Sequence, residues 1–335
     1  RRFVALGEGD YLALTDRLRA QLSDLAAIAD STGDTLKLPR AAAAFADAAI
    51  AGFHQQASPD WLKGVQRLDE AAALPVSIPT GLQAELRDYQ RDGVFWMTRM
   101  AHAGLGAILA DDMGLGKTVQ TLALLLGRAA AGPALVVAPT SVCGNWVSEA
   151  QRFAPSLRVV AFGEGDRAAM LEALGPGDVV VASYALAMIG NTAFSEVVWV
   201  TLVLDEAQML KNAATQRGRA IAALKADFRL ALTGTPVENR LSDLWSIMNL
   251  LNPGLLGRPN DFNERFAIPI ERQRDEPARA RLRRLISPFL LRRTKAQVLA
   301  DLPERTETVL RVEPAARERE FLEAMRRAEI GRAHV

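Results

Sequence analysis

The chain of 335 residues contains one cysteine, Cys143, and three histidines. A single cysteine excludes an internal disulfide framework, and His54, His102 and His334 lack the spacing of metal ligands. The sequence also has no apolar run long enough to span a bilayer and no secretory leader. We therefore expect an intracellular, reducing location and no association with a membrane.

An excess of either charge is also missing, because 40 Lys and Arg residues stand against 39 Asp and Glu residues. The net charge of +1 provides no global basic field, so nucleic acid would have to bind at a local patch. The length allows one large domain and a smaller one. Because the chain begins at Arg1 rather than Met, we expect a piece of a longer protein.

The stretch Asp111–Thr118, which reads DDMGLGKT, has the context of a phosphate-binding loop. It follows a short apolar run at 107–110 and precedes a helical pattern at 119–128, which is the strand, glycine-rich turn and helix that such a loop needs. Asp111 stands where the first glycine is usual. A glycine-rich surface turn with an exposed lysine remains the alternative.

In a phosphate loop, each of these residues has a physical role. Gly114 and Gly116 allow backbone conformations that a Cβ would forbid and let phosphate oxygens come close. The helix N-terminus adds partial positive charge. Lys117 would reach the β- and γ-phosphates of a nucleotide, and the hydroxyl of Thr118 would ligate Mg²⁺.

The N-terminal residues 1–73 are rich in alanine and predict helices, one over Tyr11–Ala29 and another that begins at Ser58. The prolines and glycine of Leu74–Gly81 indicate a linker. A further helix is predicted over Gln83–Ala103. On it, the amide of Gln90 could pair with an adenine edge, although a glutamine that faces solvent is the alternative.

After residue 110, strands and helices alternate along the chain. Continuous apolar strands separated by helices predict a parallel sheet with helices on both faces, and ligands of such sheets bind beyond the carboxyl ends of the strands. Every polar cluster in this region follows a strand. The predicted strands are 107–110, 134–138, 157–162, 178–182, 197–204 and 228–232, and the predicted helices are 142–153, 166–174 and 217–225.

The acidic pair Asp205 and Glu206 follows the predicted strand Val197–Leu204. Near a phosphate loop, the first carboxylate can hold Mg²⁺, and the second can orient or deprotonate a water that attacks the γ-phosphate. Two solvated acids at the end of a strand are the alternative. With Lys117 upstream, we favour the catalytic interpretation for all three residues.

Six separated motifs between about Leu82 and Pro303 resemble those of Swi/Snf-type ATPases in the second helicase superfamily, and are similar to bacterial relatives of chromatin remodellers. The motifs read LRDYQRDGVFWM, ADDMGLGKT, VVAPTSVCGNW, VVASYAL, LVLDEAQMLKN and LALTGTPVENRLSDLWSIMNLLNPGLLG, in the order of that family. The resemblance implies a RecA-like first motor lobe over 79–303 with a helical extension after about 255. A small, mainly helical domain and linker at 1–78 would precede it, and 304–335 would begin the connection to a second lobe.

The resemblance also implies roles for individual residues. It places adenine at Gln90, the triphosphate at Gly114, Gly116, Lys117 and Thr118, Mg²⁺ at Asp205 and the hydrolytic water at Glu206. Coupling of the ATP state to the grip on DNA would involve Gln208, where relatives often have histidine, together with Thr233, Gly234 and Thr235. The implied DNA-backbone contacts are Pro139, Thr140, Trp146, Ser183 and Tyr184.

Members of this family move along duplex DNA by ATP hydrolysis, which requires a grip on phosphates rather than on bases. The implied partners are double-stranded DNA, the second lobe of the same complete chain and a DNA-bound protein complex, in a cytoplasmic, nucleoid-associated location. Two alternatives remain open, namely a nucleotide-dependent scaffold for proteins that never translocates and a helicase that separates strands.

The C-terminal part of the sequence raises two further points. Seven basic residues between Arg279 and Lys295 stand without an acidic neighbour, and they predict either a segment that faces phosphate or links the lobes, or a solvated helix face. The last seven residues, EIGRAHV, are also encoded by one frame of a common sequencing adapter, so we expect that 329–335 are not native. We expect the arginine finger of the second lobe to be missing and hydrolysis by this chain alone to be slow.

Overall fold

A computed structural model describes residues 3–7, 10–13, 15, 29–32, 35–43, 58–163, 166–210, 215–234, 240–298 and 318. The chain separates into two compact units, Arg1–Val298 and Leu299–Val335. None of the helices in the described residues has the length and apolar character needed to cross a bilayer.

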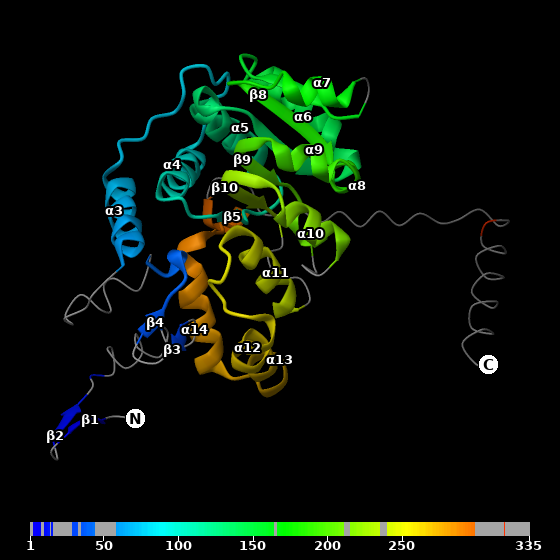
Figure 1. Ribbon diagram of the computed structural model, residues 1–335. Helices are drawn as coiled ribbons and strands as arrows, with labels where there is room; N and C mark the ends of the chain where they lie inside the picture. Colours follow the sequence, from blue (N-terminus) through cyan, green and yellow to red (C-terminus); the bar gives the residue numbers. More distant parts are fainter. Residues whose placement is uncertain are drawn as a thin grey trace, which may run out of the picture. The chain divides into compact units, whose positions relative to one another are not determined.

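The first unit is built on a seven-stranded sheet with the order β11-β5-β10-β9-β6-β8-β7. All neighbouring strands are parallel, as the continuous apolar runs predict. Figure 1 shows β5, β10 and β9 beside one another in the middle of this unit. The strands are β5 (Ala107–Leu109), β6 (Ala134–Ala138), β7 (Arg158–Ala161), β8 (Asp178–Ser183), β9 (Val198–Leu204), β10 (Lys225–Leu232) and β11 (Leu290–Leu291).

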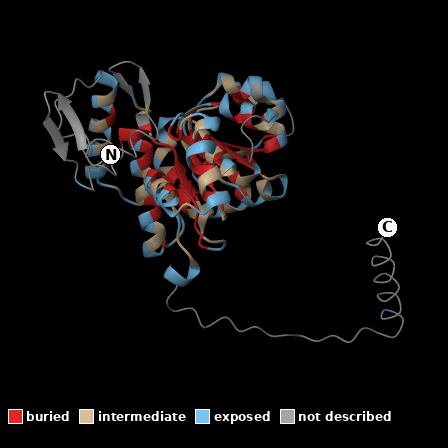
Figure 2. Cartoon of the chain, turned by 90° about the horizontal axis from the view of Figure 1, so that it is seen from below, coloured by how far each residue is buried: buried red, intermediate tan, exposed pale blue. Residues whose placement is uncertain are grey.

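Helices cover both faces of this sheet, so the central strands are almost wholly buried (Figure 2). The chain thus has the predicted α/β fold with a parallel sheet. The helices along and after the sheet are α4 (Asp88–Ala103), α5 (Lys117–Arg128), α6 (Thr140–Phe153), α7 (Arg167–Glu172), α8 (Tyr184–Ile189), α9 (Asn191–Glu196), α10 (Gln216–Ala222), α11 (Leu241–Leu251), α12 (Pro259–Phe262), α13 (Ile268–Gln273), α14 (Glu276–Ile286) and α15 (Lys295–Val298). Short 3-10 helices are η1 (Arg40–Ala42), η2 (Ala129–Ala131), η3 (Ala207–Leu210) and η5 (Ser287–Phe289), and η4 (Asn263–Ala267) is a π-helix.

The N-terminal part contains strands as well as a helix. Helix α3 (Pro59–Ala73) begins where the sequence predicts, with the hydroxyl of Ser58 accepting a hydrogen bond from Trp61 N. The helix predicted over Tyr11–Ala29 is wrong at its start, because Tyr11–Ala13 belongs to a strand, and residues 16–28 lie outside the described residues. The strands pair as antiparallel β1 (Phe3–Gly7) with β2 (Asp10–Ala13), and β3 (Asp30–Thr32) with β4 (Thr35–Lys37).

Two predicted helix boundaries also differ from the structure. Helix α4 begins at Asp88 rather than at Gln83. Gln83 N donates to Phe153 O at the end of α6, and this contact keeps residues 83–87 out of the helix. Helix α10 ends at Ala222, three residues before its predicted end, and Lys225 already begins β10. Both cases are tertiary contacts that override a local helical pattern.

Candidate functional site

Three neighbouring strands bring the predicted site residues to one edge of the sheet. Strand β10 lies between β5 and β9, and the three carboxyl ends lead into the phosphate loop, the acidic pair and Thr233. Backbone hydrogen bonds to neighbouring strands hold the chain at this edge. Thr233 N donates to Leu109 O over 3.2 Å, and Asp205 N donates to Val137 O over 2.8 Å. The predicted convergence at a carboxyl edge is therefore a consequence of strand order.

The glycine turn of the phosphate loop has a backbone that disfavours residues with side chains. Gly114 and Gly116 have φ angles of 86° and 76°, in the left-handed region that favours glycine. A Cβ on Gly116 would lie 2.5 Å from Nε2 of Gln90. Gly116 also caps the N-terminus of α5, where the first backbone N–H groups have no partner within the helix. This turn can therefore hold an anion.

Lys117 begins helix α5 and turns back to the loop. Its Nζ donates to Asp111 O over 2.7 Å and to Asp112 O over 3.4 Å. Burial lowers the pKa of Lys117, and the charges of Glu206, Asp111 and Asp205 oppose that shift. The ammonium group therefore lies within electrostatic reach of both members of the acidic pair.

Asp205 is held on three sides by donors. Trp146 Nε1 donates to its Oδ2 over 2.8 Å, and the backbone N of Glu206 donates to its Oδ1 over 2.9 Å. The hydroxyl of Tyr184 donates to its backbone oxygen over 2.8 Å. Burial raises the pKa of Asp205, and the hydrogen bond from Trp146 opposes the rise. This carboxylate is fixed in orientation, as an ion ligand should be.

These contacts involve two of the predicted DNA-contact residues, and a third, Ser183, is also buried. Trp146 and Tyr184 are each 2% exposed, and Ser183 is buried with its hydroxyl accepting from Leu186 N at the start of α8. These side chains do not face outward in the described structure, and contact of these three residues with DNA stays a prediction. Trp146 and Tyr184 support Asp205, because their polar ends point to it.

The other two residues of that set lie nearer the surface. Pro139 precedes helix α6 and is half-buried, and Thr140 begins the helix and is exposed. Both follow β6, on the same edge of the sheet as the phosphate loop. Contact of these two residues with DNA stays a prediction.

Two of the four residues predicted to couple ATP state to DNA grip, Gln208 and Thr233, form a chain of hydrogen bonds with Glu206. Gln208 Nε2 donates to Glu206 Oε2 over 2.6 Å, and Gln208 Oε1 accepts from the hydroxyl of Thr233 over 2.8 Å. Glu206 has a φ of 48°, which is unusual for a residue with a side chain. Gly234 is half-buried, and Thr235 lies outside the described residues.

Gln90 uses its amide within the protein. Its Oε1 accepts from Arg87 N over 3.0 Å and its Nε2 donates to Leu115 O over 3.2 Å. The hydroxyl of Tyr89 reaches the same carbonyl over 3.2 Å. Each amide atom retains one further hydrogen-bonding position, so contact of Gln90 with adenine stays a prediction.

Two residues of the site were missed by the sequence interpretation. Burial raises the pKa of Glu149 of α6, and the neighbouring side chain of Thr118 opposes the rise. Arg293 forms a buried ion pair with Asp111 over 2.5 Å, with side chains 13% and 0% exposed. At the position where a glycine is usual, the buried carboxylate of Asp111 thus has Arg293 as its counter-ion. Arg293 is the second of two arginines after the apolar pair Leu290–Leu291, and nothing in the sequence separates it from its exposed neighbour Arg292.

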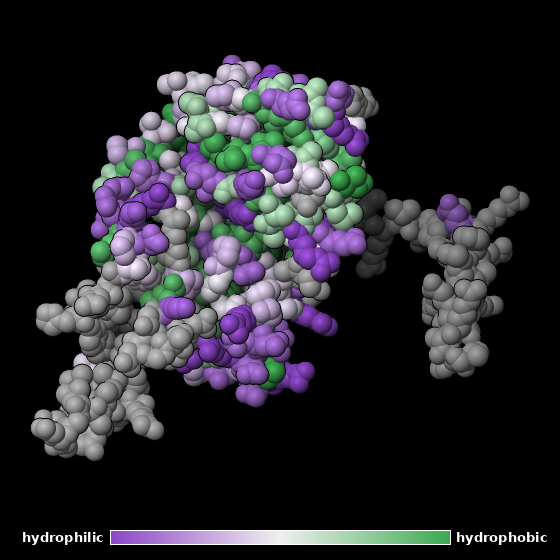
Figure 3. Space-filling model, in the orientation of Figure 1, coloured by the Kyte–Doolittle hydropathy of each residue, from purple (hydrophilic) through white to green (hydrophobic). Residues whose placement is uncertain are grey.

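The basic residues of the segment differ in how far they are exposed. Arg279, Arg283 and Arg284 are exposed on α14, and hydrophilic side chains gather over this part of the surface (Figure 3). Arg279 pairs with Glu276 over 2.6 Å. Arg293, after the helix, is turned inward to the phosphate loop. The prediction of a solvated helix face fits α14, whereas contact of the segment with phosphate or with a second lobe stays a prediction.

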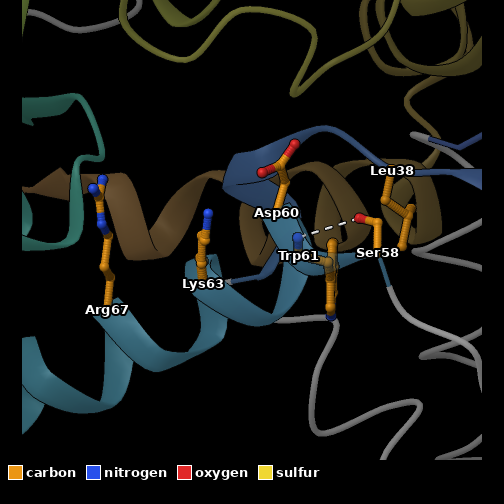
Figure 4. A pocket seen from close by; sticks show the side chains of 7 residues that line it. Leu38, Ser58, Asp60, Trp61, Lys63 and Arg67 are labelled. Carbon is orange, nitrogen blue, oxygen red and sulfur yellow. Dashed lines mark hydrogen bonds between the residues drawn. The ribbon is translucent and has the colours of Figure 1, made fainter.

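A separate cavity of about 520 Å³ lies along α3. Its lining includes Leu38, Trp61, Lys63 and Arg67, and in Figure 4 the side chains of Lys63 and Arg67 extend to the same side of the helix. None of the predicted site residues lines this cavity.

The arrangement at the sheet edge fits a triphosphate with a divalent cation. The glycine turn has positive φ angles and leads into a helix N-terminus. The ammonium group of Lys117 lies within electrostatic reach of Asp205 and Glu206, and the hydroxyl of Thr118 belongs to the next residue. Carboxylate and hydroxyl oxygens are the ligands that Mg²⁺ prefers. The same edge offers Glu206 as a base for a water molecule.

Comparisons with known proteins agree with this geometry. Residues 89–334 match the model of the family described as SNF2-related domain. The chain is 43% identical over 272 residues to YwqA of Bacillus subtilis, which is named provisionally as an ATP-dependent helicase/translocase; the match covers 77% of this chain and 29% of that protein. It is 37% identical to the ISWI chromatin-remodeling complex ATPase CHR11 of Arabidopsis thaliana, over 74% of this chain and 24% of that protein.

A solved structure extends the comparison to the fold. The Sulfolobus solfataricus SWI2/SNF2 ATPase core in complex with dsDNA is 44% identical, with a TM-score of 0.63 over 69% of this chain and 49% of that chain. The present chain therefore spans 29% and 24% of the two relatives and about half of the solved protein.

Proposed function

We propose that this chain, which belongs to the SNF2-related family, provides the ATP-binding lobe of a DNA-dependent motor ATPase. The observation that carries the proposal is the approach of Lys117 to Asp205 and Glu206 across strand β10. Use of a nucleotide is a property of the family. The identity of the nucleotide-binding residues and the role of Mg²⁺ belong to the proposal.

The phosphate loop holds the triphosphate. Backbone N–H groups at Gly114, Gly116 and the start of α5 bind phosphate oxygens, and Lys117 exchanges the carbonyl of Asp111 for a phosphate oxygen. Asp205 and the hydroxyl of Thr118 are the protein ligands of Mg²⁺, which would neutralise charge that develops on the phosphates. Asp205 is oriented beforehand by Trp146, and Thr118 neighbours the side chain of Glu149.

Hydrolysis needs a water molecule aligned with the γ-phosphate. Glu206 is placed to accept its proton, because it follows Asp205 directly and its carboxylate is held by Gln208 over 2.6 Å. Thr233 holds Gln208 in turn. Movement of the end of β10 is therefore transmitted to the base through two hydrogen bonds.

The relatives indicate what would complete the motor. Because this chain spans 29% of YwqA and 24% of CHR11, we propose that a second RecA-like lobe elsewhere in the complete protein supplies further catalytic groups. Double-stranded DNA is the proposed polymer, since the solved SWI2/SNF2 core is a complex with dsDNA. We expect this chain alone to bind Mg·ATP and to hydrolyse it slowly.

The test is Lys117→Ala in the complete protein, with ATP turnover measured with double-stranded and with single-stranded DNA. We expect duplex DNA to stimulate the unaltered protein and Lys117→Ala to abolish turnover, while Lys63→Ala on α3 has no effect. Full turnover by Lys117→Ala would contradict the proposal. A strand-displacement assay separates translocation from helicase activity, and protein binding without turnover would favour a scaffold.

A further inference from the structure

The segment Leu290–Lys295 runs beside the strand and loop that hold the phosphate site. Strand β11 pairs in parallel with β5, with Leu290 opposite Ile108 and Leu291 opposite Leu109. The pairing continues past the strands and into the loop. Ala110 N donates to Leu291 O over 2.7 Å, Asp112 N to Arg293 O over 3.0 Å, and Lys295 N to Asp112 Oδ2 over 3.0 Å.

Arg293 closes this contact with its side chain. Its Nε and Nη2 donate to the two carboxylate oxygens of Asp111 over 2.9 and 2.5 Å, and its backbone N donates to Oδ1 over 3.1 Å. The guanidinium also donates to Tyr89 O and lies over the Tyr89 ring, 5.2 Å from its centroid. The planar guanidinium, with two parallel N–H donors, orients the carboxylate of Asp111 and also balances its negative charge.

Gln120 connects the ion pair to the glycine turn. Arg293 Nη2 donates to Gln120 Oε1 over 2.8 Å, and Gln120 Nε2 lies 3.3 Å from Leu115 O and 3.2 Å from Gly116 O. The group packs tightly on α4, since a Cβ on Gly93 would overlap Gln120 Oε1 and come within 2.8 Å of Arg293 Nη2. Arg293 thus contacts the start of the phosphate loop directly, at Asp111, and its end through Gln120.

Asp111 also contacts the lysine that is proposed to bind phosphate. Its carboxylate holds Arg293 while its backbone oxygen accepts from Lys117 Nζ over 2.7 Å. A phosphate group bound by Lys117 would compete with that carbonyl. The position of Asp111 therefore responds to the ligand on one side and to Arg293 on the other.

We propose that Arg293 is a positioning residue for the phosphate loop, and that nucleotide binding and the docking of Leu290–Lys295 stabilise each other through Asp111. The inference rests on the proposed function, because it takes ATP as the ligand of the loop. By linkage, a factor by which docking of the segment strengthens ATP binding equals the factor by which ATP strengthens docking.

A purely structural role is the weaker explanation of this pair. A buried ion pair contributes little net stability, because the cost of removing both charges from water offsets their attraction, and an apolar pair of similar volume is often as stable. What the ion pair adds is a fixed geometry between two segments 182 residues apart in the chain. A fixed geometry is what a phosphate cradle requires.

The test uses this chain and a fluorescent ATP analogue with Mg²⁺, together with amide hydrogen exchange over 290–295. The main variant is the double substitution Asp111→Asn with Arg293→Met, which leaves no unpaired buried charge and is therefore expected to fold. We expect its nucleotide affinity to fall about tenfold. In the unaltered chain, the nucleotide should slow exchange over 290–295, and in the double variant it should not.

The exposed neighbour Arg292 provides the matched control, and Arg292→Ala should retain both affinity and nucleotide-dependent protection. If the double variant does not fold, Arg293→Lys keeps the charge and loses the two parallel N–H donors, and its affinity and exchange are compared in the same way. Normal affinity with normal protection in the folded variant would overturn the inference. Failure of the unaltered chain to bind the nucleotide would instead contradict the proposed function.

Discussion

The hydroxyl of Thr233 donates a hydrogen bond of 2.8 Å to the side-chain oxygen of Gln208. Because Gln208 in turn donates to Glu206, the end of β10 is connected to the proposed base. Thr233→Val keeps the volume and removes the donor. We expect DNA stimulation of ATP turnover in the complete protein to fall about 2- to 10-fold, with KM for ATP unchanged.

The control for this prediction is Thr98→Val, which removes a hydrogen bond to Val94 O within α4, away from the acidic pair. It should leave DNA stimulation intact. Equal stimulation of the Thr233 variant and the unaltered protein would show that this connection does not transmit the DNA signal.

The backbone of Glu206 predicts a conflict between stability and activity. A φ of 48° costs a non-glycine residue about 1 kcal/mol or more. Glu206→Gly removes that cost and should raise the free energy of unfolding by about 0.5–1 kcal/mol while hydrolysis is lost. Glu206→Gln should also lose hydrolysis, but its free energy of unfolding should not rise. Urea denaturation of both variants makes the comparison, and a destabilised glycine variant would contradict it.

The buried position of Trp146 predicts an effect on the metal site rather than on DNA. Trp146→Phe removes the 2.8 Å hydrogen bond to Asp205, so we expect Mg²⁺-dependent nucleotide affinity to fall about tenfold. DNA affinity at saturating nucleotide should stay unchanged. Thr140→Ala, at an exposed position, should weaken DNA binding and spare the nucleotide. The opposite pattern would identify Trp146 as a DNA contact.

Asp178 predicts how stability depends on pH. Its carboxylate accepts from Arg158 over 2.7 and 2.5 Å and from Gly175 N over 2.8 Å, and the guanidinium of Arg158 lowers the pKa of Asp178. Because the folded pKa lies below the unfolded value of about 3.9, the ionised group stabilises the fold fully above that value. Its contribution is lost as pH falls through the folded pKa.

Asp178→Asn should therefore destabilise the chain by about 1–2 kcal/mol at pH 7, and the difference should shrink as pH falls toward 4 and below. Urea unfolding across this pH range measures it. Asp69→Asn, at an exposed position on α3, should change little at any pH. A difference that grows on acidification would mean that Asp178 is not ionised in the folded chain.

The parallel sheet was predictable because its strands are short, continuous apolar runs between helices. Strand β6 has the predicted bounds, 134–138, since every residue of it is apolar and buried. The N-terminal strands could not be found in this way. Near Tyr11 the leucines recur at helical spacing, yet residues 10–13 pair with β1, and pairing with a distant segment leaves no local signal.

For the site, the sequence indicated which residues gather but not which of them face outward. Trp146 and Tyr184 follow strands as DNA contacts would, but a polar end on an aromatic ring can equally point inward to a carboxylate. Arg293 was hidden for a related reason. An arginine among basic neighbours resembles a solvated charge until its partner is known, and Asp111 lies 182 residues away.

The distance in sequence between Asp111 and Arg293 affects how the protein folds during its synthesis. The ribosome releases Asp111 and the glycine turn early, and at ordinary rates of translation Arg293 emerges roughly 10–40 s later. Until then, a carboxylate that ends up fully buried has no counter-ion, and the edge of β5 has no neighbour in β11. During that time the nascent phosphate loop lacks its partner segment and is accessible to chaperones. We therefore expect nucleotide binding to come late in the maturation of the chain.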